Sequence, residues 1–297
     1  MFKKTKCNNC YKEFDEVEDQ CPYCKTANSN KPKGWSFKMM TFVGKGKQLA
    51  IFFVGWLGLQ FLATFVSLII VLTSSTPLDP SGTTITSLEN FLAQIIPYTL
   101  LTAILLWILG KENKKVFSSF KNPFSYLGFV AGGVIIGLGI LYGLFSSQFG
   151  TGGNESAVRD LITFSPAGTF FMIVLMGPIC EEITYRLGLY SFLRRKSMLL
   201  AVLITSLIFA LIHFDINAII YLVDPAGEAG MELFKNAIII ELVNLPNYLI
   251  AGACLSLTYE YLGFAGSFLA HLTNNFVAWI QYVVPSATAV LFPLFLK

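Results

Sequence analysis

Long apolar segments without charged residues recur along the chain after residue 48. The uncharged runs are 48–78, 90–110, 122–154, 161–180, 197–214, 242–259 and 261–296. A helix needs about 20 apolar residues to cross the hydrocarbon core of a bilayer. Once their ends are adjusted, the runs predict helices over 48–73, 90–110, 124–147, 167–191, 198–220, 237–259 and 262–284, with a short eighth piece at 287–296 as a partial span. The runs lack the dyad alternation of barrel strands. The pattern therefore predicts an all-α, polytopic transmembrane bundle of seven to eight spans.

Basic residues gather in alternate connections between these helices. They are Lys45, Lys47, Lys111, Lys114, Lys115, Lys121, Arg194, Arg195 and Lys196. The connections 74–89 and 148–166 hold one basic residue between them, and segment 221–236 holds one. Because positive loops stay in the cytoplasm, we expect a multi-pass cell-membrane protein with a cytoplasmic N-terminus. The first 47 residues are polar and lack an apolar h-region, so we expect no cleavable signal peptide.

Composition narrows the class of protein further. Hydrophobic residues make up 54% of the 297 residues and charged residues 13%, against about 25% charged in typical soluble domains. This balance argues against a soluble globule and against a disordered chain. Six cysteines are too few for a secreted disulfide scaffold of this length. The net charge of +3 comes from Lys and Arg placed as membrane topology requires, so we expect a lipid bilayer as partner and no nucleic acid.

The polar N-terminal head contains two Cys-x-x-Cys pairs separated by ten residues, Cys7, Cys10, Cys21 and Cys24. Two such pairs can close a tetrahedral thiolate site around a structural Zn²⁺. The segment is too short to bury a core, so the metal would supply most of its folding free energy. Redox pairs and unpaired thiols are the alternatives. We expect a zinc-ribbon head over 1–28, a basic linker over 29–47 and a transmembrane domain over 48–297. The head's role would be docking or regulation through a protein partner.

A few ionisable residues interrupt the predicted spans. The only two histidines, His213 and His271, lie in different spans, and a third span carries Glu181, Glu182 and Arg186. Each such group costs several kcal/mol at bilayer depth and is therefore a functional candidate. At 1.5 Å per residue, Glu181 lies roughly 15–18 Å from the cytoplasmic end of its span, His213 roughly 22 Å and the segment 271–275 roughly 13–20 Å. Similar depths predict one polar pocket inside the bundle.

Helical spacing separates the roles of these residues. Glu182 and Arg186 are four apart, so they share a face and can pair. Glu181 lies about 100° around the helix from Glu182, which leaves it without a local partner. His271 and Asn275 are also four apart. A carboxylate and an imidazole can activate water, while a second imidazole and an amide can donate hydrogen bonds to an oxyanion. This set supports acid–base hydrolysis without a covalent nucleophile or a catalytic metal.

Three further features have structural interpretations. Glycines at 132, 133, 137, 139 and 143 favour close helix packing. The pair of Glu182 and Arg186 is typical of a buried structural ion pair. Glu241, Asn244 and Asn247 flank Pro246, where they would either line an access path or satisfy the backbone at a kink.

Three motifs follow one another along the chain: Glu181-Glu182-Ile-Thr-Tyr-Arg186 (EExxxR), Phe209-Ala-Leu-Ile-His213 (FxxxH) and His271-Leu-Thr-Asn-Asn275 (HxxxN). In this order, over about 120–285, the chain resembles the CPBP family of CAAX-processing and bacteriocin-processing intramembrane glutamic endopeptidases. The resemblance implies that Glu181 and His213 activate water and that His271 and Asn275 form an oxyanion hole. It implies supporting roles for Glu182, Arg186 and Phe209. The substrate would be a membrane-associated peptide, prenylated or bacteriocin-like.

Two other hypotheses compete with this endopeptidase. A metalloprotease would use Glu181, His213 and His271 as zinc ligands, although no HExxH motif is present. A non-catalytic membrane scaffold, transporter or immunity protein would bind a peptide in the same pocket without turnover. Hydrolysis by the intact protein and its loss in a Glu181 variant would separate the enzyme from the binder.

Overall fold

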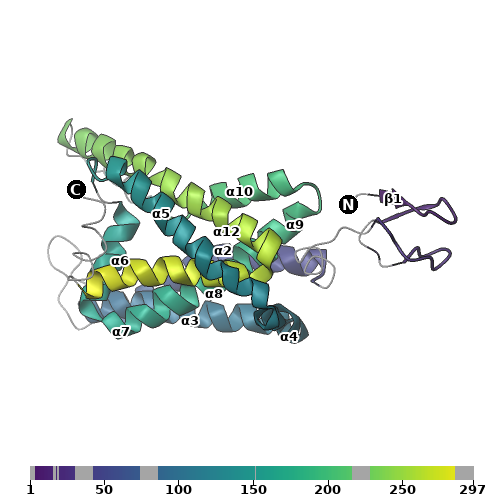
Figure 1. Cartoon of the computed structure of the whole chain (residues 1–297). Helices are drawn as coiled ribbons and strands as arrows, with labels where there is room; N and C mark the ends of the chain where they lie inside the picture. The colour runs from purple at the N-terminus through teal and green to yellow at the C-terminus, as the bar shows by residue number, and fades with distance from the viewer. Residues whose placement is uncertain are drawn as a thin grey trace.

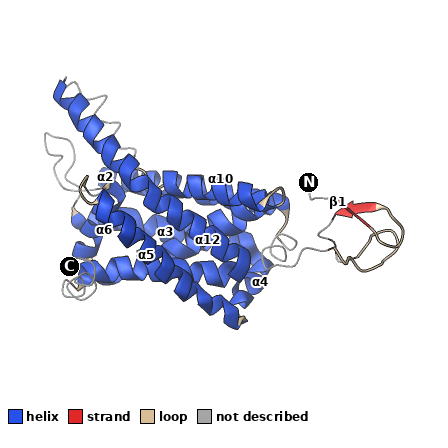
Figure 2. Ribbon diagram, turned by 45° about the horizontal axis from the view of Figure 1, so that its top comes forward, coloured by secondary structure: helices blue, strands red, loops and turns tan. Residues whose placement is uncertain are grey.

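The computed structural model describes residues 4–15, 18, 20–30, 43–73, 86–150, 152–215 and 228–284. A helical bundle forms the body of the molecule, and two short strands lie outside it (Figures 1 and 2). The principal helices are α2 (Lys45–Thr73), α3 (Ser87–Leu109), α5 (Gly128–Ser146), α6 (Gly153–Phe164), α10 (Met198–Leu211) and α12 (Glu228–Val283). The all-α membrane-type architecture predicted from the apolar runs is confirmed.

Five helical segments in the described part of the chain are long and apolar enough to cross a membrane. They are Lys45–Thr73, Ser87–Lys121, Pro123–Ser146, Pro166–Arg194 and Met231–Val283, and the apolar α10 is shorter. The predicted count of seven to eight spans is not confirmed. The last segment merges two predicted helices, the predicted helix 198–220 is helical only to Leu211, and the predicted piece at 287–296 lies outside the described residues.

The last of these segments, which forms most of α12, is too long for one crossing, since its 53 residues would extend roughly 80 Å. Gly263 interrupts it with a φ of 76°, a conformation that glycine adopts without steric cost. Figure 1 shows the chain reversing direction there. Ser125 Oγ donates to Leu262 O at 3.1 Å, and Ala265 N donates to Ser119 Oγ at 3.1 Å, so two serines satisfy the broken backbone. The break lies one residue inside the predicted helix 262–284 and separates the rest of that helix from the predicted helix 237–259.

Helix α3 begins three residues before its predicted start, because its first turn is polar. Thr86 and Glu89 form a capping box in which each side chain accepts a hydrogen bond from the other residue's backbone N–H. After α3 the chain forms short turns, which are η1 (Gly110–Glu112), α4 (Asn113–Phe117), η2 (Ser118–Lys121) and η3 (Pro123–Leu127). They join α3 to α5 at the end of the bundle opposite α6 (Figure 1).

The helix predicted over 167–191 is present but changes its winding along its length. It consists of α7 (Pro166–Thr169), the π-helix η4 (Phe170–Met176), α8 (Gly177–Glu181), the π-helix η5 (Glu182–Tyr190) and α9 (Ser191–Arg194). Widened π turns occur frequently at functional sites. The junction between α8 and η5 falls between Glu181 and Glu182.

Helix α6 lies where the sequence pattern predicted only a connection over 148–166. Leu161 and Ile162 are buried, while Glu155 and Arg159 form an exposed ion pair at 3.5 Å. Twelve residues with this amphipathic pattern are too short to be recognised as a span. The helix therefore lies beside the long helices at one end of the bundle (Figure 2).

Helix α5 packs along α12, but only part of its glycine cluster mediates the contact. A Cβ atom added at Gly132 would lie 2.6 Å from Thr273 Cβ and 2.7 Å from Ala270 O. The same atom at Gly133, Gly137, Gly139 or Gly143 would meet nothing within 4 Å. The predicted close packing thus holds at Gly132, directly beside the segment that carries His271.

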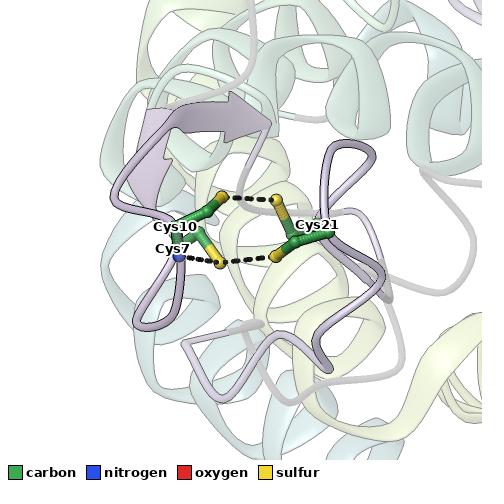
Figure 3. Close-up of side chains that lie close together, drawn as sticks. Cys7, Cys10 and Cys21 are labelled. Carbon is green, nitrogen blue, oxygen red and sulfur yellow. Dashed lines mark hydrogen bonds between the residues drawn. The ribbon is translucent and has the colours of Figure 1, made fainter.

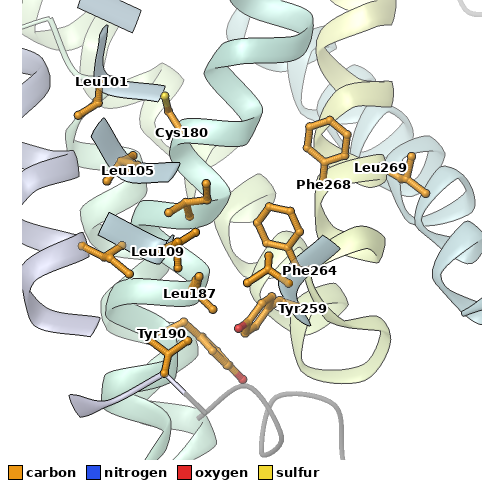
Figure 4. Packing of buried hydrophobic residues seen from close by; sticks show 14 of the residues in the cluster. Leu101, Leu105, Leu109, Cys180, Leu187, Tyr190, Tyr259, Phe264, Phe268 and Leu269 are labelled. Carbon is orange, nitrogen blue, oxygen red and sulfur yellow. The ribbon is translucent and has the colours of Figure 1, made fainter. Parts of the chain in front are cut away.

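Apolar side chains of α3, η5 and both halves of α12 form the main core (Figure 4). Leu101, Leu105 and Leu109 recur every four residues along α3, which places them on one face toward Leu187 and Tyr190 of η5. This core fixes η5, and therefore the residues at its start, against neighbouring helices.

Candidate functional site

The imidazole of His271 lies between two neighbouring carboxylates. Its Nδ1 is 2.9 Å from Glu182 Oε1, and its Nε2 is 3.7 Å from Glu181 Oε2. A carboxylate oxygen accepts a hydrogen bond, so Nδ1 carries the proton that faces Glu182. The second nitrogen then faces Glu181 at a distance too long for a direct hydrogen bond.

Glu182 is completely buried, and both of its oxygens are occupied. Oε1 meets His271 and lies 3.4 Å from Arg186 Nη1, while Oε2 accepts a hydrogen bond from Ser267 Oγ. Arg186 is also fully buried. The predicted pairing of Glu182 with Arg186 is present, and the carboxylate has two further partners that the sequence did not suggest.

Arg186 has contacts on several sides. Its guanidinium carbon lies 4.7 Å from the centre of the Phe209 ring, a cation–π arrangement, and its Nη2 donates to Gly252 O at 3.4 Å. The Phe209 ring also lies 5.9 Å from the ring of His271 and 4.7 Å from that of His213. Phe209 is therefore in contact with the arginine and with both histidines.

Glu181 differs from its neighbour in having a buried oxygen without a hydrogen-bond partner, Oε2. This is the oxygen that faces His271 Nε2. The side chain is partly accessible, at 14% exposure, whereas Glu182 is at 0%. The sequence-based expectation that Glu181 is the carboxylate without a local partner agrees with this geometry.

His213 lies just beyond the end of α10. Its Nδ1 is 2.7 Å from Phe209 O. Since a carbonyl can only accept, Nδ1 carries a proton, and in the neutral ring Nε2 is free to accept one. Its ring stacks on Tyr248 with centroids 4.5 Å apart and an interplanar angle of 18°. Glu181, His271 and Arg186 are the ionisable neighbours that act on this ring electrostatically.

Asn275 lies one turn after His271, as the four-residue spacing predicted. Its Nδ2 donates to Ile173 O in the π-helix η4 at 2.8 Å. An amide nitrogen has two N–H donors, so this bond orients the group and leaves one donor available. Asn274 Nδ2 lies 3.3 Å from Asn275 Oδ1 and holds the other end of the amide.

The residues beside Pro246 make structural contacts. Glu241 accepts hydrogen bonds from the backbone N–H groups of Gly153 at 2.7 Å and Asp215 at 3.1 Å. Asn244 Nδ2 donates to Ile240 O at 2.8 Å. These bonds favour the backbone-satisfying interpretation over an access path.

The structure brings most of the predicted site together and adds two residues that sequence reasoning missed. Ser267 lies four residues before His271, so its helical spacing could have identified it. Tyr248 had no such signal, since its contact with His213 joins two different helices. Among the described residues, the side chains close enough together to hold a metal ion are the four N-terminal cysteines. Glu181, His213 and His271 do not form such a cluster.

Those cysteines lie in two loops with the same backbone pattern. In the first loop Tyr11 N donates to Cys7 O, and in the second Lys25 N donates to Cys21 O, both at 2.9 Å. Tyr11 and Lys25 have matching positive φ values of 57° and 60°. The strands β1 (Lys4–Lys6) and β2 (Glu13–Asp15) pair antiparallel and flank the first loop.

The four sulfur atoms converge between these loops, all within 4.8 Å of one another (Figure 3). Cys7 Sγ and Cys24 Sγ are 3.4 Å apart, and Cys10 Sγ and Cys21 Sγ are 3.5 Å apart. Tetrahedral Zn²⁺ at ~2.3 Å from each sulfur would need separations of about 3.8 Å. The four cysteines can therefore hold a metal ion.

Local hydrogen bonds favour thiolates at two of these sulfurs. The backbone N–H groups of Cys10 and Asn9 lower the pKa of Cys7, and the Thr26 hydroxyl lowers the pKa of Cys24 to about 6. The pKa of Cys10 is about 12: the Lys12 backbone lowers it, but burial and the three neighbouring cysteines raise it. Since thiolates are the metal-binding form, the environment suits a cation.

Together, the apolar helices and the buried cluster of ionisable side chains define a multi-pass helical membrane protein with a polar site inside its bundle. Residues 163–277 match the family model described as type II CAAX prenyl endopeptidase Rce1-like. The match contains all three motifs and confirms the family resemblance of the membrane core. The match covers less than half of the chain and shows a likeness to CAAX-type endopeptidases. No curated protein and no solved structure matches the chain.

Proposed function

We propose that this protein is an intramembrane glutamic endopeptidase in which Glu181 activates the attacking water. The observation that carries this proposal is the difference between the two adjacent carboxylates. Glu182 is occupied by Arg186, His271 and Ser267, whereas Glu181 has a buried oxygen without a hydrogen-bond partner. A carboxylate with a free lone pair in a low-dielectric site can take a proton from water.

His213 shares the activation of water. Its Nδ1–H is held by Phe209 O, which leaves Nε2 as the basic nitrogen. A water between this nitrogen and Glu181 would be polarised by both groups as it attacks the peptide carbonyl. The proton then passes to the leaving amine.

His271 and Asn275 stabilise the oxyanion that forms. Glu182 accepts a hydrogen bond from Nδ1–H of His271 and so fixes the ring, and a ring that also carries a proton on Nε2 can donate it to the developing oxygen charge. Asn275 donates through the N–H that Ile173 leaves available.

The substrate is a peptide or protein segment within or at the membrane, of the prenylated or bacteriocin-like type. The family match supports a CAAX-type peptide. The location of the site between helices supports a substrate that reaches it from the bilayer or its surface.

The cysteine head holds structural Zn²⁺, and the N-terminus lies in the cytoplasm. The sulfur geometry supports the first statement. For the second, the basic segments α4 and α9 lie at the same end of the bundle (Figure 1). Common placement of cationic segments is what the positive-inside rule predicts for a cytoplasmic face.

A comparison of Glu181→Gln with Glu155→Gln tests the function. Peptides from cells that express each variant or the wild type are compared, and candidate substrates are then assayed with purified protein. We expect Glu181→Gln to abolish cleavage, with at least a 100-fold loss typical of removing a general base. Glu155→Gln removes an exposed carboxylate and should cleave normally. Equal cleavage by Glu181→Gln would contradict the proposal, and equal cellular function without cleavage would indicate a peptide-binding scaffold.

A further inference from the structure

Helix α10 holds the His213 side chain at one ring atom, through the hydrogen bond to Phe209 O. Regular α10 ends at Leu211, so the histidine sits in the turn that follows it. The hydrogen bond from Nδ1 to Phe209 O fixes one atom of the ring. A ring held at one atom can still change the direction in which its opposite atom points. Activation of water requires the opposite atom, Nε2, to hold a fixed direction.

A tyrosine from another helix covers the ring face. Tyr248 of α12 stacks on His213 at 4.5 Å and 18°, closer to parallel than Phe209, which lies at 47°. A near-parallel stack restricts rotation of an imidazole about its Cβ–Cγ bond.

The tyrosine is itself anchored at its far end. Asn154 Nδ2, in the first turn of α6, donates to Tyr248 Oη at 3.1 Å. Glu241 lies seven residues before Tyr248, two turns along the same face of α12. It accepts N–H groups from Gly153 of α6 and from Asp215, two residues after His213. Helix α12 thus holds both the start of α6 and the chain beyond His213.

We propose that Tyr248 is a positioning residue for His213, and that its stack, fixed by Asn154, directs Nε2 toward the water that Glu181 activates. The proposal rests on the proposed function for its kinetic consequence, whereas the ordering of the ring can be measured without any activity. It also assigns a role to α6, which orients the site from outside the matched motifs.

The ordering is tested by NMR on full-length protein labelled with ¹⁵N-histidine in detergent micelles. The chain contains only two histidines, so His213→Asn assigns both sets of signals. We expect wild-type His213 to give one sharp tautomer with the proton on Nδ1. Tyr248→Leu should produce averaged or broadened signals, and Tyr248→Phe, which keeps the ring but loses the hydroxyl that Asn154 binds, should broaden them less than Tyr248→Leu.

Tyr142→Leu is the matched control. Tyr142 also contacts α12, through a 2.7 Å hydrogen bond to Val243 O, but it does not stack on a histidine. It should leave the His213 signals unchanged. Unchanged His213 signals in Tyr248→Leu, or equal broadening in Tyr142→Leu, would overturn the positioning role.

The kinetic test uses cleavage by variants in two backgrounds. Tyr248→Leu should lower kcat roughly tenfold to hundredfold with KM changed less than about twofold, because a misdirected base affects the chemical step. In the His213→Ala background the same substitution should have no further effect. An equal loss in both backgrounds would assign Tyr248 a general packing role. If the wild type cleaves nothing while NMR shows the ordering, the catalytic function fails and the positioning contact stands.

Discussion

Two adjacent glutamates have opposite environments because they point to different sides of one helix. Glu182 faces Arg186, His271 and Ser267 and is fully buried. Glu181 is left with His271 Nε2 at 3.7 Å. One imidazole therefore links the fully buried carboxylate of Glu182 to the carboxylate that we propose as the base. Any change at Glu182 or Arg186 should affect the chemistry indirectly, through the orientation of His271.

Removing the buried arginine should cost far more stability than removing an exposed one. In Arg186→Met the buried Glu182 loses its cationic partner, and we expect a loss of about 3–5 kcal/mol in the free energy of unfolding. Arg159→Met breaks the exposed pair with Glu155, where both side chains are almost half accessible, and should cost about 0–1 kcal/mol. Unfolding in detergent measures both. Equal losses would show that the buried pair is not a structural element.

Helical spacing alone predicted part of this arrangement. The four-residue separation of Glu182 and Arg186 placed them on one face, and Glu181 was left over. The contact of Glu182 with His271 joins residues 89 apart, and the stack of Tyr248 on His213 joins two helices. Periodicity within one segment carries no information about which faces of different helices meet, so these contacts required the structure.

At the scale of elements, the position of His271 depends on how closely α5 approaches α12. The Cβ that alanine would introduce at Gly132 lies 2.7 Å from the backbone oxygen of Ala270, and Ala270 directly precedes His271. A backbone atom cannot move aside as a flexible side chain can. The approach of α5 is therefore coupled to the proposed catalytic residues His271 and Asn275 through the backbone of α12.

Gly132→Ala should accordingly push these helices apart. We expect a loss of about 1–3 kcal/mol from overpacking and a fall in the cleavage rate. Gly133→Ala is the matched control, since nothing lies within 4 Å of its added Cβ and alanine stabilises a helix by about 0.5–1 kcal/mol over glycine. Thermal unfolding and cleavage assays compare the two. Similar behaviour of both variants would contradict the proposed close contact.

Other features of the elements depart from the sequence pattern for identifiable reasons. Hydrophobic length predicts where a membrane helix runs, but it does not distinguish α from π winding, so η4 and η5 were not predicted. The short amphipathic α6 falls below the length of a span. The break at Gly263 falls at the start of the predicted helix 262–284, and the serines that satisfy its backbone come from distant segments.

The whole molecule joins two parts that are stabilised in different ways. The bundle has an apolar core, whereas the buried cluster of the head consists of Phe14 and its cysteines. Charge distribution and cysteine spacing predicted this division from the sequence. The domain limits at 28 and 47 remain predictions, and much of the expected linker lies outside the described residues.

Removal of the metal from the cysteine head by a chelator should show whether the metal is structural or is needed for cleavage. A strong chelator should release about one zinc ion per chain from wild-type protein, and Cys21→Ser with Cys24→Ser should contain none, because each loop supplies half of the thiolate set. Metal analysis measures both. Cleavage of a peptide by the chelated wild type should continue at the original rate, since the proposed mechanism takes its acid–base and oxyanion groups from Glu181, His213, His271 and Asn275 and needs no metal. A loss of cleavage that only added zinc restores would instead favour a metalloprotease that uses the carboxylate and the two histidines as ligands.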